Sequence, residues 1–212
     1  MATPWNDDPS AFTAVIEQNI RRLVPDLQKQ ARSRVIPSVA IAQDWHHAIY
    51  VSVQLPVPYY AGEIRDSDTR FPELIGYEVR IGPHRGVPSA QVPAQLSLFE
   101  AALQQTCGTL DGVVPPGTKP TSEGDMFSVV QLAAIVHGEW VRIHPFANGN
   151  GRTARLWGNW IAMRYALPPF VTIKPRPTGL LYAGAAAQSM SGDHAAMVVV
   201  FNDLLRQKLA GR

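Results

Sequence analysis

The chain is poor in cysteine: Cys107 is the single one among 212 residues, so no intramolecular disulfide bond can form. Structural disulfides are typical of secreted proteins, and their exclusion indicates a reducing compartment. The first eight residues contain neither a basic segment nor an apolar segment of the kind found in secretory signals. No apolar run approaches the ~20 residues that span a bilayer. These absences predict a cytoplasmic protein without a membrane partner.

The chain also lacks a strong excess of charge of one sign. Its formal net charge is +2, and its arginines are scattered apart from Arg152 and Arg155, so no nucleic-acid partner is predicted. Hydrophobic residues make up 46% and charged residues 17% of the chain, a balance typical of globular and not of disordered proteins. The length suits one well-filled core, and we expect a single domain over residues 1–212.

Apolar residues recur with helical spacing along most of the chain, which predicts a mainly α-helical fold. A first helix is expected to start near Ser10 and to end or kink at Pro25, with a short second helix through Arg32. Further helices are expected over residues 39–48, 93–105, 126–143, 150–166, 179–190 and 193–209, the last capped by Asp193.

Two segments depart from the helical pattern. Glycines and prolines punctuate residues 59–87, and residues 77–81 alternate like a strand, so a short β-hairpin is predicted there. Residues 107–124 have no apolar period and carry five glycines or prolines within 108–117, which predicts a loop.

Residues 144–155 read His-Pro-Phe-Ala-Asn-Gly-Asn-Gly-Arg-Thr-Ala-Arg. His144 titrates near neutrality and can take a proton from a hydroxyl. The glycines allow backbone N–H groups to approach an anion, and a helix beginning after them adds its N-terminal dipole. Arg152 and Arg155 are three residues apart and would share one face of that helix. The segment therefore predicts a nucleotide phosphate site.

This segment resembles the signature of the Fic domain family, His-Pro-Phe-x-(Asp/Glu)-Gly-Asn-Gly-Arg-x-x-Arg, at every fixed position except Asn148. The resemblance continues at residues 60–65, 79–82, 141–143 and 182–193. It implies a Fic-type helical domain with a β-hairpin flap at about 77–88 and a signature loop and helix at 144–166. It also implies transfer of AMP from ATP to a Ser, Thr or Tyr hydroxyl of a target protein, including the chain itself.

The resemblance implies a role for each residue of the nucleotide site. His144 is the implied general base. Gly149, Asn150 and Gly151 are implied to form an anion hole, with Asn150 adding a side-chain donor. Arg152 and Arg155 are implied to hold the β- and γ-phosphates. Tyr182 is expected against the adenine or ribose, although an aromatic residue at helical spacing is also typical of a core.

The flap offers a second implied site. An exposed strand there would pair with an extended segment of the target through main-chain hydrogen bonds and place the acceptor hydroxyl over His144. An ordinary surface hairpin is the alternative. The residues expected to dock the target are Val79, Arg80, Ile81 and Gly82.

Asn148 stands where the family usually has an acid that holds Mg²⁺. Mg²⁺ prefers hard oxygen ligands from carboxylates and phosphates. An amide carbonyl can coordinate but carries no charge, so we expect weaker metal binding and slower transfer, with Mg²⁺ held largely by the phosphates of ATP. The alternative is an inactive or repurposed enzyme.

Residues 13–19, Thr-Ala-Val-Ile-Glu-Gln-Asn, resemble the inhibitory motif of the family, (Ser/Thr)-x-x-x-Glu-(Gly/Asn), with Gln18 at a position usually held by glycine. The resemblance implies an N-terminal inhibitory helix at about 10–23 whose Glu17 pairs with Arg155. The carboxylate would compete with the γ-phosphate for one guanidinium. Alternatively, Glu17 is a solvated residue paired with Arg21 four positions later.

Other functions remain open at this point. One is a nucleotide-binding regulatory protein that Asn148 has deprived of catalysis, and another is a Fic relative that transfers UMP or phosphocholine. A kinase-like relative is disfavoured because Gly-Asn-Gly-Arg and the second arginine are kept. We expect a twofold homodimer by default. No chemistry is assigned to the histidines outside the signature, which are His46, His47, His84, His137 and His194.

Overall fold

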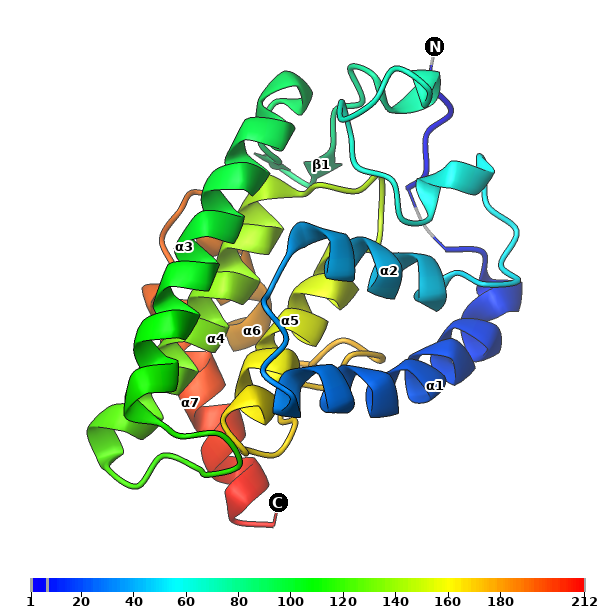
Figure 1. Ribbon diagram of the computed structural model, residues 1–212. Coiled ribbons are helices and arrows are strands. Elements are labelled where there is room, and N and C mark those ends of the chain that lie inside the picture. The colour runs from blue at the N-terminus through cyan, green and yellow to red at the C-terminus, as the bar shows by residue number, and fades with distance from the viewer. Residues whose placement is uncertain (1, 7, 212) are drawn as a thin grey trace.

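The computed structural model describes residues 2–6 and 8–211. In this part of the chain seven α-helices pack against one another, and one small hairpin projects from them (Figure 1). The helices are α1 (Thr13–Arg32), α2 (Val39–Ile49), α3 (Val92–Val113), α4 (Glu123–Ile143), α5 (Asn150–Arg164), α6 (Leu180–Ser189) and α7 (Ala195–Leu209). The hairpin consists of β1 (Arg80–Ile81) and β2 (His84–Arg85). The predicted mainly α-helical fold with a short hairpin is confirmed.

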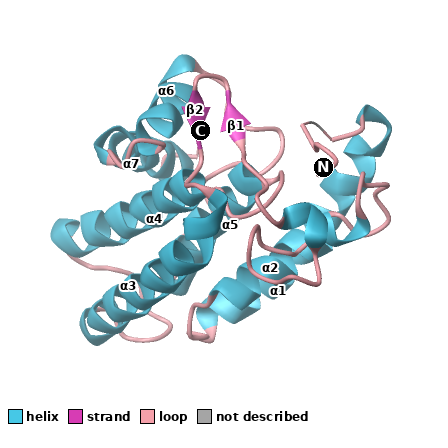
Figure 2. Cartoon of the chain, turned by 90° about the horizontal axis from the view of Figure 1, so that it is seen from above, coloured by secondary structure: helices cyan, strands magenta, loops and turns pink. Residues whose placement is uncertain are grey.

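Helices α4 and α5 form the centre of the fold, and the signature loop joins them. Helix α1 packs on α5 and α2, α3 packs along α4, and α6 and α7 cover the remaining side of α4 (Figures 1 and 2). Tryptophan rings fill the space between these helices: the ring centroids of Trp140 and Trp157 are 5.9 Å apart, and that of Trp45 lies 4.7 Å from Trp157. The signature loop therefore rests on a rigid aromatic core. No helix in the described part of the chain is both long and apolar enough to cross a membrane.

The prediction that the first helix ends or kinks at Pro25 is wrong, because α1 continues through it to Arg32. Pro25 lies on the exposed face of α1, so the carbonyl of Arg21, which loses its helical partner, can bond to water. On the opposite face Leu23, Leu27 and Ala31 are buried on both sides of the proline. Packing of this face offsets the missing hydrogen bond.

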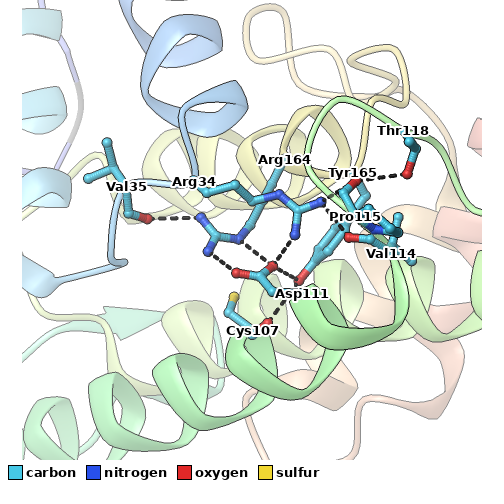
Figure 3. Close-up of polar contacts among 9 residues, drawn as sticks. All are labelled: Arg34, Val35, Cys107, Asp111, Val114, Pro115, Thr118, Arg164 and Tyr165. Atoms are coloured by element: carbon cyan, nitrogen blue, oxygen red, sulfur yellow. Dashed lines mark hydrogen bonds and ion pairs between the residues drawn. The ribbon is translucent and has the colours of Figure 1, made fainter.

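The predicted loop over 107–124 is also partly wrong, because α3 extends to Val113 and leaves residues 114–122 between the helices. Cys107 and Leu110 are buried on this last part of α3. The carboxylate of Asp111 accepts from Arg34 and from Arg164, whose Nη2 lies 2.5 Å from Oδ2 (Figure 3). Contacts with α5 and with the turn that follows α1 thus stabilise a segment whose glycines disfavour a helix.

The hairpin is shorter than the predicted strand over 77–81. Arg80 pairs with Arg85 and Ile81 with His84 in antiparallel register, and Gly82 in the turn has φ +57°. Tyr77 is outside the ladder because its carbonyl accepts from the guanidinium of Arg65 at 2.6 Å. The hairpin is therefore anchored at its base by a side chain and projects as a small exposed flap.

Candidate active site

His144 ends α4 in the left-handed conformation, with φ 52° and ψ 59°, and turns the chain into the signature loop. Its Nδ1 is bonded to the carbonyl of Val141. A carbonyl can only accept, so Nδ1 carries the ring hydrogen and Nε2 presents its lone pair. Burial lowers the pKa of His144 to about 4, which keeps the ring neutral at neutral pH. A neutral imidazole with a free Nε2 has the form that a general base requires.

Arg65 fixes His144 and the flap to each other. Its side chain is fully buried, and its Nε donates to the carbonyl of His144 at 2.8 Å. The two terminal nitrogens donate to the carbonyls of Tyr77, Val87 and Ile143 at 2.6 to 3.1 Å. Burial lowers the pKa of Arg65 to about 10, so it stays charged at neutral pH. One buried cation thus joins the end of α4 to both legs of the hairpin segment.

Asn150 closes the signature loop. Its Oδ1 accepts from the N–H of Phe146 at 2.9 Å, and its Nδ2 donates to the carbonyl of Phe146, also at 2.9 Å. The side chain of Asn150 is buried, and both of its ends are used within the loop. The structure therefore gives this amide a positioning task, and its role as a side-chain donor to phosphate stays a prediction.

His46, which received no role from the sequence, supports the same loop from α2. Its Nδ1 accepts from the N–H of Gly62 at 2.9 Å, so the hydrogen is on Nε2, which donates to the carbonyl of Asn148 at 2.9 Å. Its ring stacks on Phe146 with centroids 3.8 Å apart. Burial lowers the pKa of His46 to about 3, so it acts as a neutral strut.

Gly149 follows at the N-cap of α5 with φ +77°. A Cβ at this position would lie 2.7 Å from His46 Nε2 and 2.7 Å from the Tyr50 hydroxyl. A side chain is therefore excluded both by the backbone conformation and by the space.

Asn148 and Gly149 bond to each other: the N–H of Gly149 donates to Oδ1 of Asn148 at 2.6 Å. Asn148, the predicted metal ligand, thus accepts the hydrogen bond of Gly149, one of the predicted anion-hole donors. Within residues 2–6 and 8–211 no group of three or more His, Cys, Asp or Glu side chains is placed to hold a metal ion. The described side chains do not by themselves form a site that fits Mg²⁺, which demands several hard oxygen ligands.

A cavity of about 550 Å³ opens in front of His144. Its volume falls in the range of small-molecule sites. The flap forms one wall through residues 77–81, the signature loop forms another, and residues 5, 6 and 8 reach its rim. Four arginines line it: Arg80 of the flap, the predicted Arg152 and Arg155, and Arg176, which the sequence analysis did not single out. Their charges suit an anionic ligand.

Arg152 already has an anionic partner. It forms an ion pair with the carboxylate of Asp8, and both side chains are 12% exposed. It also donates to the hydroxyl of Tyr50. Trp5 anchors this N-terminal segment. Its backbone N–H donates to the hydroxyl of Tyr77 at 2.8 Å, and its ring packs edge-on against that of Tyr50, with centroids 4.8 Å apart. A carboxylate thus occupies the arginine predicted to hold the β-phosphate.

Arg155 is held from behind. Its Nε donates to the carbonyl of Ile173 at 3.0 Å and its Nη1 to the hydroxyl of Tyr182 at 3.4 Å. The same hydroxyl lies 2.8 Å from Nε2 of His137. Tyr182 is buried and is not among the residues that line the cavity. Its hydroxyl points at Arg155 instead of the predicted position against adenine or ribose.

The structure does not bring Glu17 and Arg155 together. Glu17 forms an ion pair with Arg21 at 3.7 Å, which is the alternative that helical spacing allowed. Helix α1 is held in place by Asn19, whose Nδ2 donates to the carbonyls of Ile49 at 3.1 Å and Val51 at 2.8 Å. The predicted pair is thus not formed in this arrangement of α1.

Comparison with known proteins adds sequence relatives. The sequence model of the Fic/DOC family matches residues 38–162. The protein adenylyltransferase Fic of Aedes aegypti is 38% identical over 76 residues, which cover 30% of this chain and 15% of the relative. The protein adenylyltransferase fic-1 of Caenorhabditis elegans is 52% identical over 42 residues, covering 20% of this chain and 8% of the relative. The chain therefore spans less than a fifth of the length of these relatives.

Solved structures share the fold over most of the chain. A Fic domain containing signaling protein from Bacteroides thetaiotaomicron has a TM-score of 0.68 and 18% identity, covering 95% of this chain and 72% of that one. BepC from Bartonella tribocorum, solved with bound AMPPNP, has a TM-score of 0.59 and 19% identity, covering 89% of this chain and 86% of that one. The family match extends over more than half of the chain and includes the whole signature from His144 to Arg155. The chain belongs to the Fic/DOC family.

Proposed function

We propose that this chain is a nucleotidyltransferase that transfers AMP from ATP to a hydroxyl of a target protein. The observation that carries the proposal is the neutral His144, whose Nε2 makes no hydrogen bond within the described residues and which lines the same cavity as four arginines. Support comes from relatives named protein adenylyltransferases and from Fic structures with bound AMPPNP and ADP.

The proposed reaction uses the residues of the signature directly. Nε2 of His144 takes the proton of a Ser, Thr or Tyr hydroxyl while the hydroxyl oxygen attacks the α-phosphorus. A new phosphorus–oxygen bond forms, the bond from the α-phosphorus to the bridging oxygen breaks, and pyrophosphate leaves. Proton transfer of this kind contributes about 10² to 10⁴-fold. Arg152 and Arg155 would stabilise the charge of the leaving group through planar forks that match phosphate oxygens.

The backbone of the signature loop would bind the other phosphate oxygens. The N–H groups at residues 149–151 precede or open α5, where the helix dipole favours an anion. Because Asn148 now accepts from Gly149, its amide would have to rotate when a phosphate oxygen takes this donor. Mg²⁺ would enter with the phosphates of ATP and supply charge neutralisation, with Asn148 as its single signature ligand.

The flap is the proposed docking site for the target. Val79, Arg80 and Ile81 line the cavity, and Ile81 is 44% exposed. An extended segment could pair with this edge by main-chain hydrogen bonds, which need no particular target sequence. The buried Arg65 would keep the docked segment in register with His144.

Restraint by Glu17 stays a prediction. It requires Glu17 to exchange Arg21 for Arg155, whose guanidinium now bonds to Ile173 and Tyr182. Glu17→Gly removes the carboxylate and tests the pairing, because a restrained enzyme becomes more active and an unrestrained one does not.

A nucleotide-binding protein without transfer activity is the second candidate. It is favoured by Asn148, whose neutral amide is bonded to Gly149 and leaves the cavity without the acid of the family signature. Transfer of UMP or phosphocholine is a third candidate, of which the same experiment tests UMP transfer.

The experiment incubates wild type, Glu17→Gly and His144→Ala with Mg²⁺ and ATP labelled at the α-phosphate, both alone and with a cell extract as the source of targets. Label on protein that depends on His144 supports AMP transfer, and UTP labelled at the α-phosphate tests the UMP alternative. If ATP raises the melting temperature of wild type while neither His144-containing protein transfers label, the binding-protein candidate replaces the enzyme.

A further inference from the structure

A chain of polar contacts runs from the cavity wall into the interior of the protein. It begins at Arg155 on α5, passes through the hydroxyl of Tyr182 on α6 at 3.4 Å, and ends at Nε2 of His137 on α4 at 2.8 Å. Tyr182 and His137 are buried and do not line the cavity. The signature arginine is thus connected to two residues that cannot themselves touch a ligand there.

Each contact in this chain has one direction. A guanidinium can only donate, so the oxygen of Tyr182 accepts from Arg155. The single hydrogen of the hydroxyl is then available to Nε2 of His137, which accepts it in the tautomer that carries the ring hydrogen on Nδ1. Burial, with the charge of Arg155 as the next cause, lowers the pKa of His137 to about 3, so the ring is neutral and Nε2 is able to accept. Burial also raises the pKa of Tyr182, which keeps its hydrogen in place.

This series of hydrogen bonds lowers the stability of the folded protein. Nδ1 of His137 is buried and has no hydrogen-bond partner within the described residues. Such a group destabilises the fold, and an apolar side chain of similar size would avoid this cost. The cost indicates that the polar contact to Tyr182 serves something other than packing.

Its effect falls on Arg155. Nε is bound to Ile173 and Nη1 to Tyr182, whereas Nη2 makes no hydrogen bond within the described residues. Arg155 lines the cavity, so the guanidinium is held along its rear edge and keeps its remaining donors for an anion. Holding a flexible side chain in its binding geometry before the ligand arrives reduces the entropy lost on binding.

We propose that Tyr182 and His137 are positioning residues that hold Arg155 toward the γ-phosphate and thereby make the cavity prefer a nucleoside triphosphate to a diphosphate. This inference rests on the proposed function, in which Arg155 binds the γ-phosphate. Neither residue takes part in the chemistry, and both act through Arg155.

The test measures the dissociation constants of ATP and ADP by titration calorimetry with Mg²⁺ present. The full chain carries His144→Ala so that no transfer occurs during the titration. Tyr182→Phe removes the hydroxyl alone and is expected to weaken ATP binding by about 2- to 10-fold, with ADP binding unchanged. His137→Phe is expected to do the same. His137→Gln should keep the preference for ATP that His137→Phe loses, because its amide oxygen can accept the tyrosine hydrogen.

Tyr165→Phe is the matched control. It also removes a buried tyrosine hydroxyl, which here bonds to Asp111 at 3.0 Å and to the carbonyl of Cys107 at 3.3 Å, away from the cavity. It should lower the melting temperature and leave the ratio of the ATP and ADP dissociation constants unchanged. A higher ratio of the ATP to the ADP dissociation constant in Tyr182→Phe, at a melting temperature equal to or above that of Tyr165→Phe, therefore reports positioning and not general loss of structure.

Arg155→Ala separates the two levels of the argument. If it abolishes the preference for ATP while Tyr182→Phe and His137→Phe keep the wild-type ratio, the positioning role is overturned and the role of Arg155 stands. If Arg155→Ala leaves the ratio unchanged as well, Arg155 does not bind the γ-phosphate, and the proposed nucleotide geometry fails together with the inference.

Discussion

The carboxylate of Asp8 is paired with the guanidinium of Arg152 at the rim of the cavity, although the two residues are 144 positions apart in the chain. Arg152 belongs to the signature and is proposed to hold a phosphate. A phosphate must therefore displace Asp8 or share the arginine with it. This competition occurs at a different arginine from the pair of Glu17 and Arg155 that the sequence predicted.

Asp8→Asn is expected to raise the affinity for ATP by about 10-fold, because the charge that competes for Arg152 is removed while the shape of the side chain is kept. The measurement is calorimetric titration in the His144→Ala background. Asp68→Asn is the matched control, since Asp68 pairs with Arg70 on an exposed loop outside the cavity. Equal ATP affinity in Asp8→Asn and wild type would show that the pair does not compete.

Arg65→Lys is expected to reduce both stability and transfer. Lysine keeps the positive charge but cannot reach the four carbonyls that Arg65 contacts, so some of them are left buried and unpaired. We expect the free energy of unfolding to fall by about 2–4 kcal/mol. Urea unfolding measures the loss, with Arg85→Lys on the exposed strand as control. A loss no larger than that of the control would mean that the carbonyls find other partners.

The protein should lose stability as the pH falls below about 6.5. Burial lowers the pKa values of His46 and His137 to about 3 and that of His144 to about 4. Between these values and the unfolded value near 6.5 the unfolded chain binds more protons than the folded chain, so acid favours unfolding. Each histidine contributes a slope of up to about 1.4 kcal/mol per pH unit.

The measurement is urea unfolding at several pH values from about 4.5 to 6.5, where most carboxyl groups are still ionised in both states. His46→Gln should show a smaller slope than wild type in this window, whatever its stability near neutral pH. A wild-type stability that stays constant across the window would contradict the predicted burial of neutral histidines.

Asn148→Asp is expected to increase AMP transfer and to lower the Mg²⁺ concentration needed for half-maximal rate. The carboxylate brings a full charge to a position where the wild-type amide is neutral and is bonded to the N–H of Gly149. Asn148→Ala is the control, because it frees Gly149 without adding charge. If alanine and aspartate raise the rate equally, release of the Gly149 donor limits the wild type and metal capture does not.

Helices with strong apolar periods were predictable from the sequence, and the errors have local causes. Residues 107–113 carry glycines that disfavour a helix, yet α3 continues there because Asp111 is bonded to Arg34 in the turn after α1 and to Arg164 on α5. Pro25 was expected to interrupt α1 because a helix loses a hydrogen bond at proline. Its exposed position makes that loss small, and exposure depends on packing.

The site shows the same division. His144 and the arginines were identifiable because the signature lies within one short segment, where the order of residues is enough to recognise the chemistry. Three buried residues belong to no motif of their own and could not be identified in this way: His46, His137 and Arg65. His46 and Arg65 are also far from His144 in the chain, at 98 and 79 positions. Their contacts with the loop, with Tyr182 and with the flap depend on how α2, α4 and the hairpin segment meet.

The sequence by itself determined the helical class, the signature loop and the proposed base, because these depend on residues that are close along the chain. Tertiary structure alone decided that Asp8 pairs with Arg152, that Glu17 pairs with Arg21, and that Tyr182 stands behind Arg155. Local spacing sets which face of a helix a residue occupies. The residue that contacts this face depends on the packing of distant segments. Burial there requires that polar groups be hydrogen-bonded and that charges be paired.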